Sequence, residues 1–373
     1  MVDGVPESMS SSHGAGLSWR AWAPPFAAIG LAFLEHEHVA PAQSIPVTVF
    51  ACVLLLGSVF AAVHHAEVVG LKVGEPFGSI LLALAVTVIE ASLIVTAMLT
   101  SGGHETALVR DTVFSAVLIV LNGVVGLCLL IGGWRYREQA FRVEGTASAL
   151  SVLATLAVLT LVLPNTTLSK LGPQYSPTQL LFISSLSILL YGVFVFVQSV
   201  RHRDYFLGDY DGDEEEEEAA PSGSATAISA VLLIVSLAAV VLLAETLTPS
   251  VEGAIRSWGL PGSFLGVVIA ALVLLPESVT AVKAAYANRV QTSLNLALGS
   301  ALATIGLTVP VVGALSLYLG QELTLGLDAE GTALLLLTLF VSSLTLATGR
   351  ATILQGAVHL VVFGAFLLLA AVP

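Results

Sequence analysis

Apolar runs of about twenty residues recur along nearly the whole chain, and the run from Gly78 to Leu99 is typical of them. A run of that length crosses a bilayer as one helix, because only a helix satisfies its own backbone hydrogen bonds in the hydrocarbon. Hydrophobic residues make up 56% of the 373-residue chain and charged residues only 10%, against about 25% in soluble domains. The sequence therefore predicts an all-α polytopic membrane protein.

The apolar runs predict about eleven transmembrane helices, one near the N-terminus followed by two groups of five. They are expected at 19–35, 46–70, 77–101, 112–133, 146–164, 178–199, 226–248, 262–286, 292–318, 330–348 and 351–371. The predicted organisation is a disordered N-terminus (1–18), an extra N-terminal helix and loop (19–45), a first repeat (46–200), an acidic linker (201–225) and a second repeat (226–373).

The basic residues are unevenly distributed between the loops of this arrangement. If the N-terminus is cytoplasmic, ten of the 13 lysines and arginines lie on the cytoplasmic side and only Arg110, Lys170 and Arg256 lie outside. Lysine and arginine are enriched in cytoplasmic loops of membrane proteins. We therefore expect the N-terminus and the acidic linker in the cytoplasm and the C-terminus outside.

The net charge of −13 comes largely from the acidic linker, which contains the run from Glu214 to Glu218. A run of like charges is typical of a solvated segment, and the alternative is a segment that concentrates cations by loose electrostatic attraction. The acids are too clustered for an EF-hand. The expected partners are the lipid bilayer and transported ions, with no nucleic acid. Cys52 and Cys128 lie in apolar runs without metal-type spacing and predict no disulfide.

Two of the apolar runs carry a carboxylate near their middle, Glu90 in the run 77–101 and Glu277 in the run 262–286. A charged acid at the centre of a spanning helix costs roughly 2.5–3.5 kcal/mol on insertion scales. An intramembrane acid is therefore a candidate for ion or proton handling, the alternative being a protonated acid that hydrogen-bonds a neighbouring helix.

The two halves of the chain repeat the same arrangement of acids. Glu67 lies near the end of one run and Glu90 in the middle of the next, and Glu245 and Glu277 follow the same order in the second half. Each half has five runs, and because five is odd the second half is inverted relative to the first. Inverted repeats with functional groups near the bilayer midplane are typical of secondary transporters that work by alternating access.

Two carboxylates facing each other in a site of low dielectric cannot both stay ionised without a counter-charge. The pair of Glu90 and Glu277 would therefore hold either protons or a cation, and competition between the two is antiport. Glu67 and Glu245 would each line the access path from one face of the membrane, or lie as interfacial acids. No cofactor and no enzymatic activity are expected, because the sequence has no P-loop and no dinucleotide-binding glycine pattern.

A hard cation such as Ca²⁺ takes six to eight oxygen ligands, more than two glutamates supply. Pro276 removes a helical hydrogen bond and exposes an upstream carbonyl oxygen. Hydroxyl and amide side chains on the same or following runs are further candidates, although each taken singly is better explained as a packing or interhelical hydrogen-bonding residue. These candidates are Thr87, Ser278, Asn122, Asn295, Ser300 and Thr304.

His64 and His65 lie beside Glu67 and would either shuttle protons or form a polar patch at the membrane interface. The same three residues suggest a second function, an intramembrane metal hydrolase. A zinc protease of this kind needs two histidines at helical i, i+4 spacing, which this segment lacks. A third alternative is a cation channel, which the inverted repeat argues against.

Several motifs resemble the two alpha repeats of the calcium/cation antiporter superfamily, in its cation/proton exchanger branch. The segments that carry this resemblance run from Ala66 to Glu90, from Ala244 to Glu277 and from Leu294 to Ala301. The segments Leu274 to Ser278, Arg110 to Phe114 and Asn122 to Gly126 are similar to the bacterial ChaA type of calcium or sodium/proton antiporter.

The resemblance implies that Glu90 and Glu277 are the central ligands of the cation and the proton, with Glu67 and Glu245 as auxiliary acids. It also implies ten core helices in two inverted repeats, one extra N-terminal helix, and a location in a bacterial plasma membrane. In the commoner family pattern a Gly-Asn-Ala-x-Glu stretch precedes each central acid, whereas those places here read Val86-Thr87-Val88-Ile89-Glu90 and Leu274-Leu275-Pro276-Glu277. Transport of Ca²⁺ is the first expectation, and exchange of Na⁺ or K⁺ for protons stays open beside it.

Overall fold

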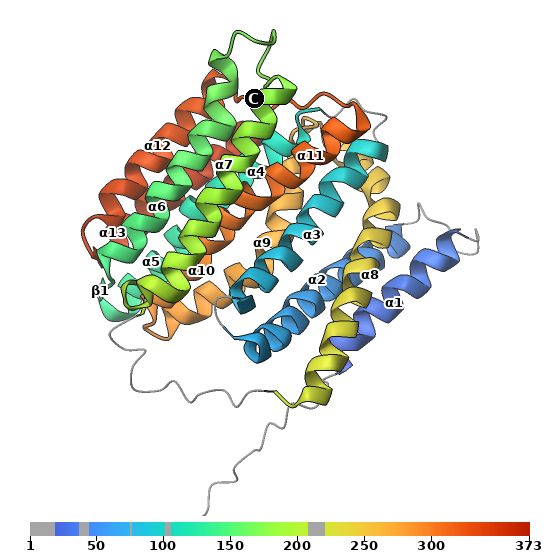
Figure 1. Ribbon diagram of the computed structural model, residues 1–373, viewed down its shortest axis with the longest axis horizontal. Coiled ribbons are helices and arrows are strands. Elements are labelled where there is room, and N and C mark those ends of the chain that lie inside the picture. Colours follow the sequence, from blue (N-terminus) through green and yellow to red (C-terminus); the bar gives the residue numbers. More distant parts are fainter. Residues whose placement is uncertain (1–18, 37–44, 75–76, 101–105, 208–220) are drawn as a thin grey trace, which may run out of the picture.

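The computed structural model describes residues 19–36, 45–74, 77–100, 106–207 and 221–373. The predicted disordered N-terminus and most of the acidic linker lie outside the described residues. The described chain is almost entirely helical, as a chain with apolar runs in a bilayer must be (Figure 1).

The first repeat follows the N-terminal helix α1 (Trp19–His36). Its elements are α2 (Ile45–Val73), α3 (Phe77–Thr100), α4 (Leu108–Leu118), η1 (Ile119–Val124), α5 (Val125–Tyr136), β1 (Gln139–Ala140), α6 (Val143–Ala157), η2 (Val158–Val162), η3 (Leu163–Thr166), α7 (Pro177–Phe196), η4 (Val197–Arg201) and η5 (Arg203–Phe206). The elements of the second repeat are α8 (Gly223–Ser257), α9 (Phe264–Tyr286), α10 (Val290–Ala303), η6 (Thr304–Thr308), α11 (Val309–Leu319), α12 (Ala329–Leu346), β2 (Arg350–Ala351) and α13 (Ile353–Ala371).

Ten helical segments in the described part of the chain are long and apolar enough to cross a membrane, five in each repeat. They confirm the polytopic fold and match the predicted spans after the first. The first predicted span forms the 18-residue helix α1, which is not among the ten and carries Pro24 and Pro25 in its interior.

Polar side chains cap the starts of three of the helices. Ser176 and Gln179 form a reciprocal capping box at the start of α7, and Thr352 and Gln355 do the same for α13. The Asp328 carboxylate accepts a hydrogen bond from the Gly331 N–H at the start of α12. These capping residues therefore mark, in the sequence, where α7, α12 and α13 begin.

The third spanning helix of each repeat is interrupted by a π-helical turn, which the sequence did not predict. The turn is η1 between α4 and α5 in the first repeat, and η6 between α10 and α11 in the second. Such turns widen the helix locally, leave a backbone group unpaired and are frequent at functional sites.

The fifth helix of each repeat packs against the third helix of the other repeat. Thus α13 lies against α5 and η1, and α7 lies against α11 and η6. The helices α1, α2 and α8 pack on one another and, in Figure 1, lie together at one side of the molecule, with α3 between them and the rest. The two repeats are therefore interlocked in one body rather than placed side by side.

The loops divide between the two ends as the predicted alternation requires. At one end β1 pairs with β2, Arg350 bonds Glu138, and Arg142 bonds the Asp204 carbonyl oxygen. At the other end the Lys170 ammonium lies 3.0 Å from a carboxylate oxygen of Glu322. Each end thus joins the loops of both repeats.

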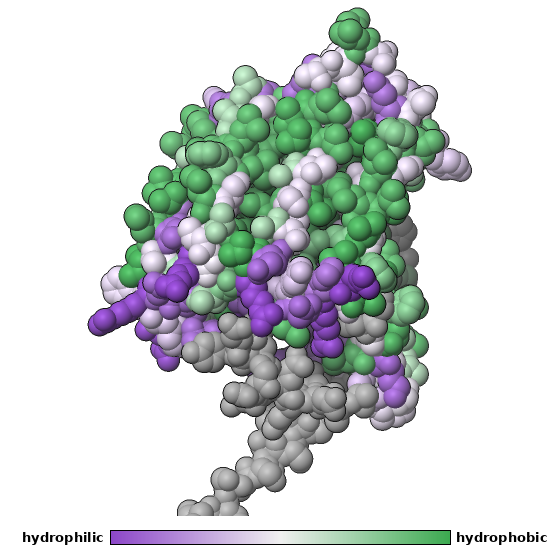
Figure 2. Space-filling view, turned by 60° about the vertical axis from the view of Figure 1, so that its left-hand side comes forward, coloured by the Kyte–Doolittle hydropathy of each residue, from purple (hydrophilic) through white to green (hydrophobic). Residues whose placement is uncertain are grey.

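The surface between the two ends is apolar. Figure 2 shows hydrophobic residues over most of the visible face, with a band of hydrophilic residues near its lower end. Exposed large apolar side chains include Phe182, Leu189 and Phe196 on α7 and Phe340 and Leu344 on α12. An exposed apolar surface of this extent suits contact with lipid.

Candidate functional site

Glu90 is sealed in the interior of the molecule, with 1% of its surface exposed. It belongs to α3, and its partners come from the π-helical turn of the other repeat. The Thr308 hydroxyl donates to Glu90 Oε2 over 2.7 Å, and the Thr304 side chain, one turn earlier, also hydrogen-bonds Glu90. The turn η6 therefore delivers two hydroxyls to one carboxylate.

Glu277 lies on α9 and is half-buried. Its Oε2 atom is buried without a hydrogen-bond partner in the described part of the chain. Glu277 interacts electrostatically with Glu67 and with Glu90. The structure therefore brings together three of the four acids that the sequence singled out, across both repeats.

The two auxiliary acids are both exposed, Glu67 on α2 and Glu245 on α8. The electrostatic interaction with Glu277 associates Glu67 with the central site. The role of Glu245 in an access path stays a prediction.

His65 faces the N-terminal helix. Its Nε2 lies 3.0 Å from the Ala21 carbonyl oxygen, and the side chain is 1% exposed. That carbonyl has no helical donor, because Pro25, four residues later, has no N–H. His65 therefore satisfies a backbone group freed by a proline, and His64 beside it is exposed. This contact favours docking of α1 over a hydrolytic metal site for His65.

Three of the predicted oxygen ligands lie on the helices of the central site. The hydroxyls of Thr87 and Ser278 donate within their own helices, to the carbonyl oxygens of Ala83 and Leu274. Ser300 Oγ, one turn before Thr304, is buried and has no hydrogen-bond partner among the described residues. Ser300 and Glu277 therefore each keep an oxygen free.

The two asparagines are placed elsewhere. The Asn295 amide donates to the Phe206 carbonyl oxygen and accepts from Gln291, about 13 Å along the helix from Thr304 at 1.5 Å per residue. Asn122 lies in η1, fully buried, and its amide nitrogen donates to Thr338 Oγ1 over 2.8 Å. Neither side chain is shown beside a central acid.

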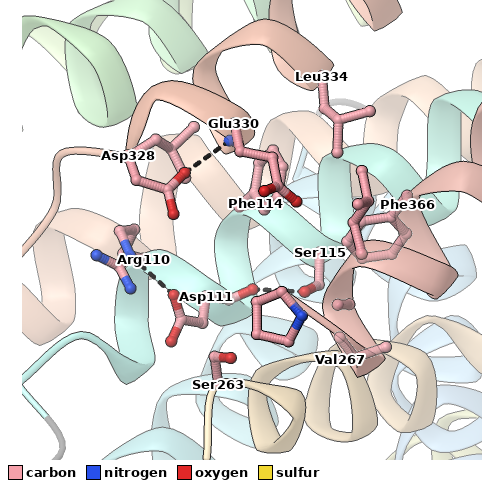
Figure 3. Close-up of a pocket in the computed structure, with 15 residues that line it drawn as sticks. Arg110, Asp111, Phe114, Ser115, Ser263, Val267, Asp328, Glu330, Leu334 and Phe366 are labelled. Atoms are coloured by element: carbon pink, nitrogen blue, oxygen red, sulfur yellow. Dashed lines mark hydrogen bonds and ion pairs between the residues drawn. The ribbon is translucent and has the colours of Figure 1, made fainter. Parts of the chain in front are cut away.

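A cavity of about 120 Å³ lies at the end of the molecule where α4, α9 and α12 begin (Figure 3). Arg110 Nε donates to Asp111 Oδ1 over 2.8 Å, and Asp328 accepts from the Gly331 N–H. Asp111 and Asp328 are thus already engaged, and Glu330 is a third acid that lines the cavity. A Cβ at Gly266 would lie 2.7 Å from the Asp111 backbone, so this segment sets the close approach of α4 and α9.

The sequence reasoning missed two residues of the transmembrane interior. Thr308 lies four residues after Thr304 on the same helix face, and this spacing from a predicted ligand could have identified it from the sequence. His359 on α13 is 1% exposed and contacts Asn122. It is an ionisable residue within an apolar span, the criterion that identified Glu90.

The sequence profile of the family described as sodium/calcium exchanger protein matches residues 44–200 and 228–372, which together make up most of the chain. The chain belongs to this family. It is a multi-pass membrane antiporter of cations, as the resemblance to the calcium/cation antiporter superfamily implied. The two matched segments each contain one copy of the interrupted third helix.

Several relatives of this antiporter align over most of their length. The y4hA protein of Sinorhizobium fredii is 49% identical over 95% of this chain and 96% of its own. The sodium-potassium/proton antiporter ChaA of Escherichia coli is 34% identical over 87% of this chain and 90% of its own. The Ca²⁺/H⁺ antiporter of Aphanothece halophytica is 25% identical over 80% of this chain and 82% of its own.

The fold of the antiporter is shared with solved structures of lower sequence identity. Native YfkE superposes with a TM-score of 0.72 at 18% identity, covering 94% of this chain and 99% of that one. The H⁺/Ca²⁺ exchanger CAX superposes with a TM-score of 0.64 at 15% identity, covering 92% of this chain and 87% of that one. At this identity the likeness concerns the fold alone.

Proposed function

We propose that the protein exchanges protons for a cation at a shared site formed by Glu90 and Glu277. The observation that carries this proposal is the placement of Glu90, sealed beside two hydroxyls of the other repeat and coupled electrostatically to Glu277. A buried carboxylate is stable either protonated or paired with a cation. A carboxylate that binds the cation must therefore first release its proton.

Na⁺ or K⁺ is the favoured cargo. The 34%-identical relative from Escherichia coli is a sodium-potassium/proton antiporter, which supports this choice. The two carboxylates and the hydroxyls of Thr304, Thr308 and Ser300 offer up to seven oxygens, a number that would also serve Ca²⁺.

Ca²⁺ is the second candidate cargo. Two ionised glutamates would balance its double charge, and the 25%-identical relative from Aphanothece halophytica is a Ca²⁺/H⁺ antiporter. With a divalent cargo both Glu90 and Glu277 would release their protons in each cycle. With a monovalent cargo one of them would stay protonated.

The orientation proposed for this transporter places the N-terminus and residues 201–225 in the cytoplasm of a bacterium. The basic residues of the loops at the β1–β2 end support it, since Arg135, Arg142 and Arg350 all lie there. In this orientation Glu67 lies toward the cytoplasmic end of α2 and Glu245 toward the outer end of α8. Transport involves no covalent change to the ion.

The test is proton movement in proteoliposomes with an internal pH dye, with Na⁺, K⁺ and Ca²⁺ added separately. Wild type is compared with Glu90→Gln and Glu277→Gln, and with Glu330→Gln as a control acid that is exposed at the start of α12. We expect exchange in wild type and in Glu330→Gln and none in the two central variants. Exchange at the wild-type rate in both central variants would show that the shared site is wrong.

A further inference from the structure

The π-helical turn η1 leaves one carbonyl oxygen without its helical donor. The N–H of Val125 donates to Val120, five residues back, instead of to Leu121, four residues back. The Leu121 carbonyl oxygen lies in the membrane interior, where an unpaired backbone group is costly. Another group must therefore satisfy it if η1 is to persist.

His359 of α13 supplies that group. Its side chain hydrogen-bonds the Leu121 backbone, and its Nδ1 lies 3.2 Å from Asn122 Oδ1. Its Nε2 lies 3.1 Å from Thr345 Oγ1 on α12. A single buried ring therefore contacts two consecutive residues of η1 and anchors them to α12.

The partners of the ring determine which nitrogen carries the proton. The Asn122 amide nitrogen donates to Thr338, so its oxygen faces His359 and only accepts. Nδ1 is then the donor to η1, and in the neutral ring Nε2 accepts from the Thr345 hydroxyl. The result is a continuous polar chain from α12 through α13 to η1.

The matching turn of the other repeat shows what such a turn does. In η6, Thr304 and Thr308 hold the Glu90 carboxylate. The inverted repeat pairs η1 with α9 in the way that it pairs η6 with α3. The turn η1 packs against α9, the helix that carries Glu277. The register of η1 therefore fixes which of its atoms face the helix of the second acid.

We propose that His359 is a positioning residue of the transport site. It keeps η1 in its π-helical register through Leu121 and Asn122, and so sets the affinity of the Glu277 half of the site for the cation. This role rests on the exchange activity proposed above. His359 touches neither the cation nor the proton it competes with.

Three substitutions separate the two ring nitrogens. His359→Asn places an amide N–H where Nδ1 stands, His359→Gln places one where Nε2 stands, and His359→Leu has no donor. The control is Ser342→Ala on α12, because Ser342 is 1% exposed and its hydroxyl has no partner among the described residues. Each variant is assayed in proteoliposomes for the KM of the transported cation and for the maximal rate, with monodispersity and thermal midpoint measured in detergent.

We expect His359→Leu to raise KM roughly tenfold or more, as loss of a group that orients a cation ligand typically does. His359→Gln should resemble it, His359→Asn should recover most of the wild-type KM, and Ser342→Ala should match wild type. The maximal rate should change less than KM in each case. A structural role alone would instead lower the thermal midpoint and the amount of active protein without moving KM.

An unchanged KM in monodisperse His359→Leu overturns the proposal. A KM in His359→Gln that is as close to the wild-type value as that of His359→Asn, or closer, overturns it too. If His359→Leu does not fold, the comparison of Asn with Gln decides alone, since both keep one amide donor in the membrane interior. Wild type is measured in parallel. Absence of coupled exchange in wild type would overturn the proposed function, whereas exchange in wild type with no KM effect would overturn only the role of His359.

Discussion

The two interrupted helices occupy equivalent places in the inverted repeats but make different contacts. The turn η6 gives its Thr304 and Thr308 hydroxyls to Glu90, which is almost fully enclosed. In η1, Asn122 hydrogen-bonds Thr338 and His359 and no central acid. The half-buried Glu277 keeps one carboxylate oxygen without a partner in the described part of the chain. One half of the site is closed around its acid and the other half is not.

An alternating-access transporter built from inverted repeats needs this inequality. If both halves had the same surroundings at once, the site would be either open to both faces, so that ions would leak, or closed to both, so that none could enter. The open half holds Glu277 and its electrostatic partner Glu67, so access in this conformation is expected from the Glu67 end of the molecule. The opposite conformation would exchange the roles of the two halves.

The largest effect is expected from shortening the enclosed acid. Glu90→Asp withdraws the carboxylate by one methylene group from hydroxyls that are fixed on η6. A displacement of about 1 Å in a fixed site costs on the order of 100-fold in rate. Glu277→Asp, in the looser half, should cost about tenfold or less by the same measure. Initial rates of cation-driven proton movement in proteoliposomes give both values, with Glu330→Asp as the control.

Equal losses in Glu90→Asp and Glu277→Asp would mean that the contrast between the two halves plays no part in transport. A greater loss of rate in Glu277→Asp than in Glu90→Asp would mean that the Glu277 half is the more tightly constrained one.

The next effect concerns the contact of α13 with α5. A Cβ at Gly356 would lie 2.7 Å from Leu130 Cα and 2.8 Å from the Gly126 carbonyl oxygen, both on the backbone of α5. Gly356→Ala should therefore destabilise the protein by about 2 kcal/mol through overpacking. The matched variant is Gly299→Ala on α10, where nothing lies within 4 Å and alanine should be neutral or favourable. Thermal midpoints in detergent compare the two, and a similar decrease in both would contradict the close approach of α5 and α13.

A smaller effect is expected from removing a single hydroxyl next to Glu90. Thr308→Val keeps the shape of the side chain and removes its 2.7 Å hydrogen bond to the acid, which should raise the KM of the cation roughly tenfold. Thr87→Val is the control, because Thr87 is equally buried on α3 but donates to the Ala83 carbonyl oxygen. Cation titrations of exchange measure both. A KM in Thr308→Val equal to that in Thr87→Val would remove the η6 hydroxyls from the site.

Much of the fold could be predicted because the bilayer permits few structures. Apolar runs of spanning length must be helical, so the predicted spans from 46 onward correspond to the ten observed membrane helices. The π-helical turns could not be predicted from periodicity, because one extra residue shifts the helical pattern by only part of a turn. The stretches that form η1 and η6 read as ordinary apolar helix.

The central acids could be predicted from their cost in the membrane, whereas most of their neighbours could not. Thr304 was identified by its place in the repeat, and Thr308 needed only the helical spacing from Thr304. His359 contacts Leu121 and Asn122 from a helix more than 200 residues later, and no local pattern indicates which helix faces η1. The roles of these residues stay predictions until transport is measured.

The smallest effect is expected outside the membrane, where Lys170 and Glu322 join the end loops of the two repeats. The Lys170 ammonium lowers the pKa of the Glu322 carboxyl, so the pair contributes stability above the ordinary pKa of a glutamate, about 4.3, and loses it as the pH falls through the lowered value. Glu322 is exposed and Lys170 is half-buried at the surface, and salt screens such pairs. Lys170→Ala should therefore lower the thermal midpoint only slightly at pH 7 and low salt. The difference from wild type should vanish in high salt and at a pH low enough to protonate Glu322. A difference that persists under both conditions would assign the effect to packing of the lysine stem, and the two repeats would then be joined at this end without electrostatic help.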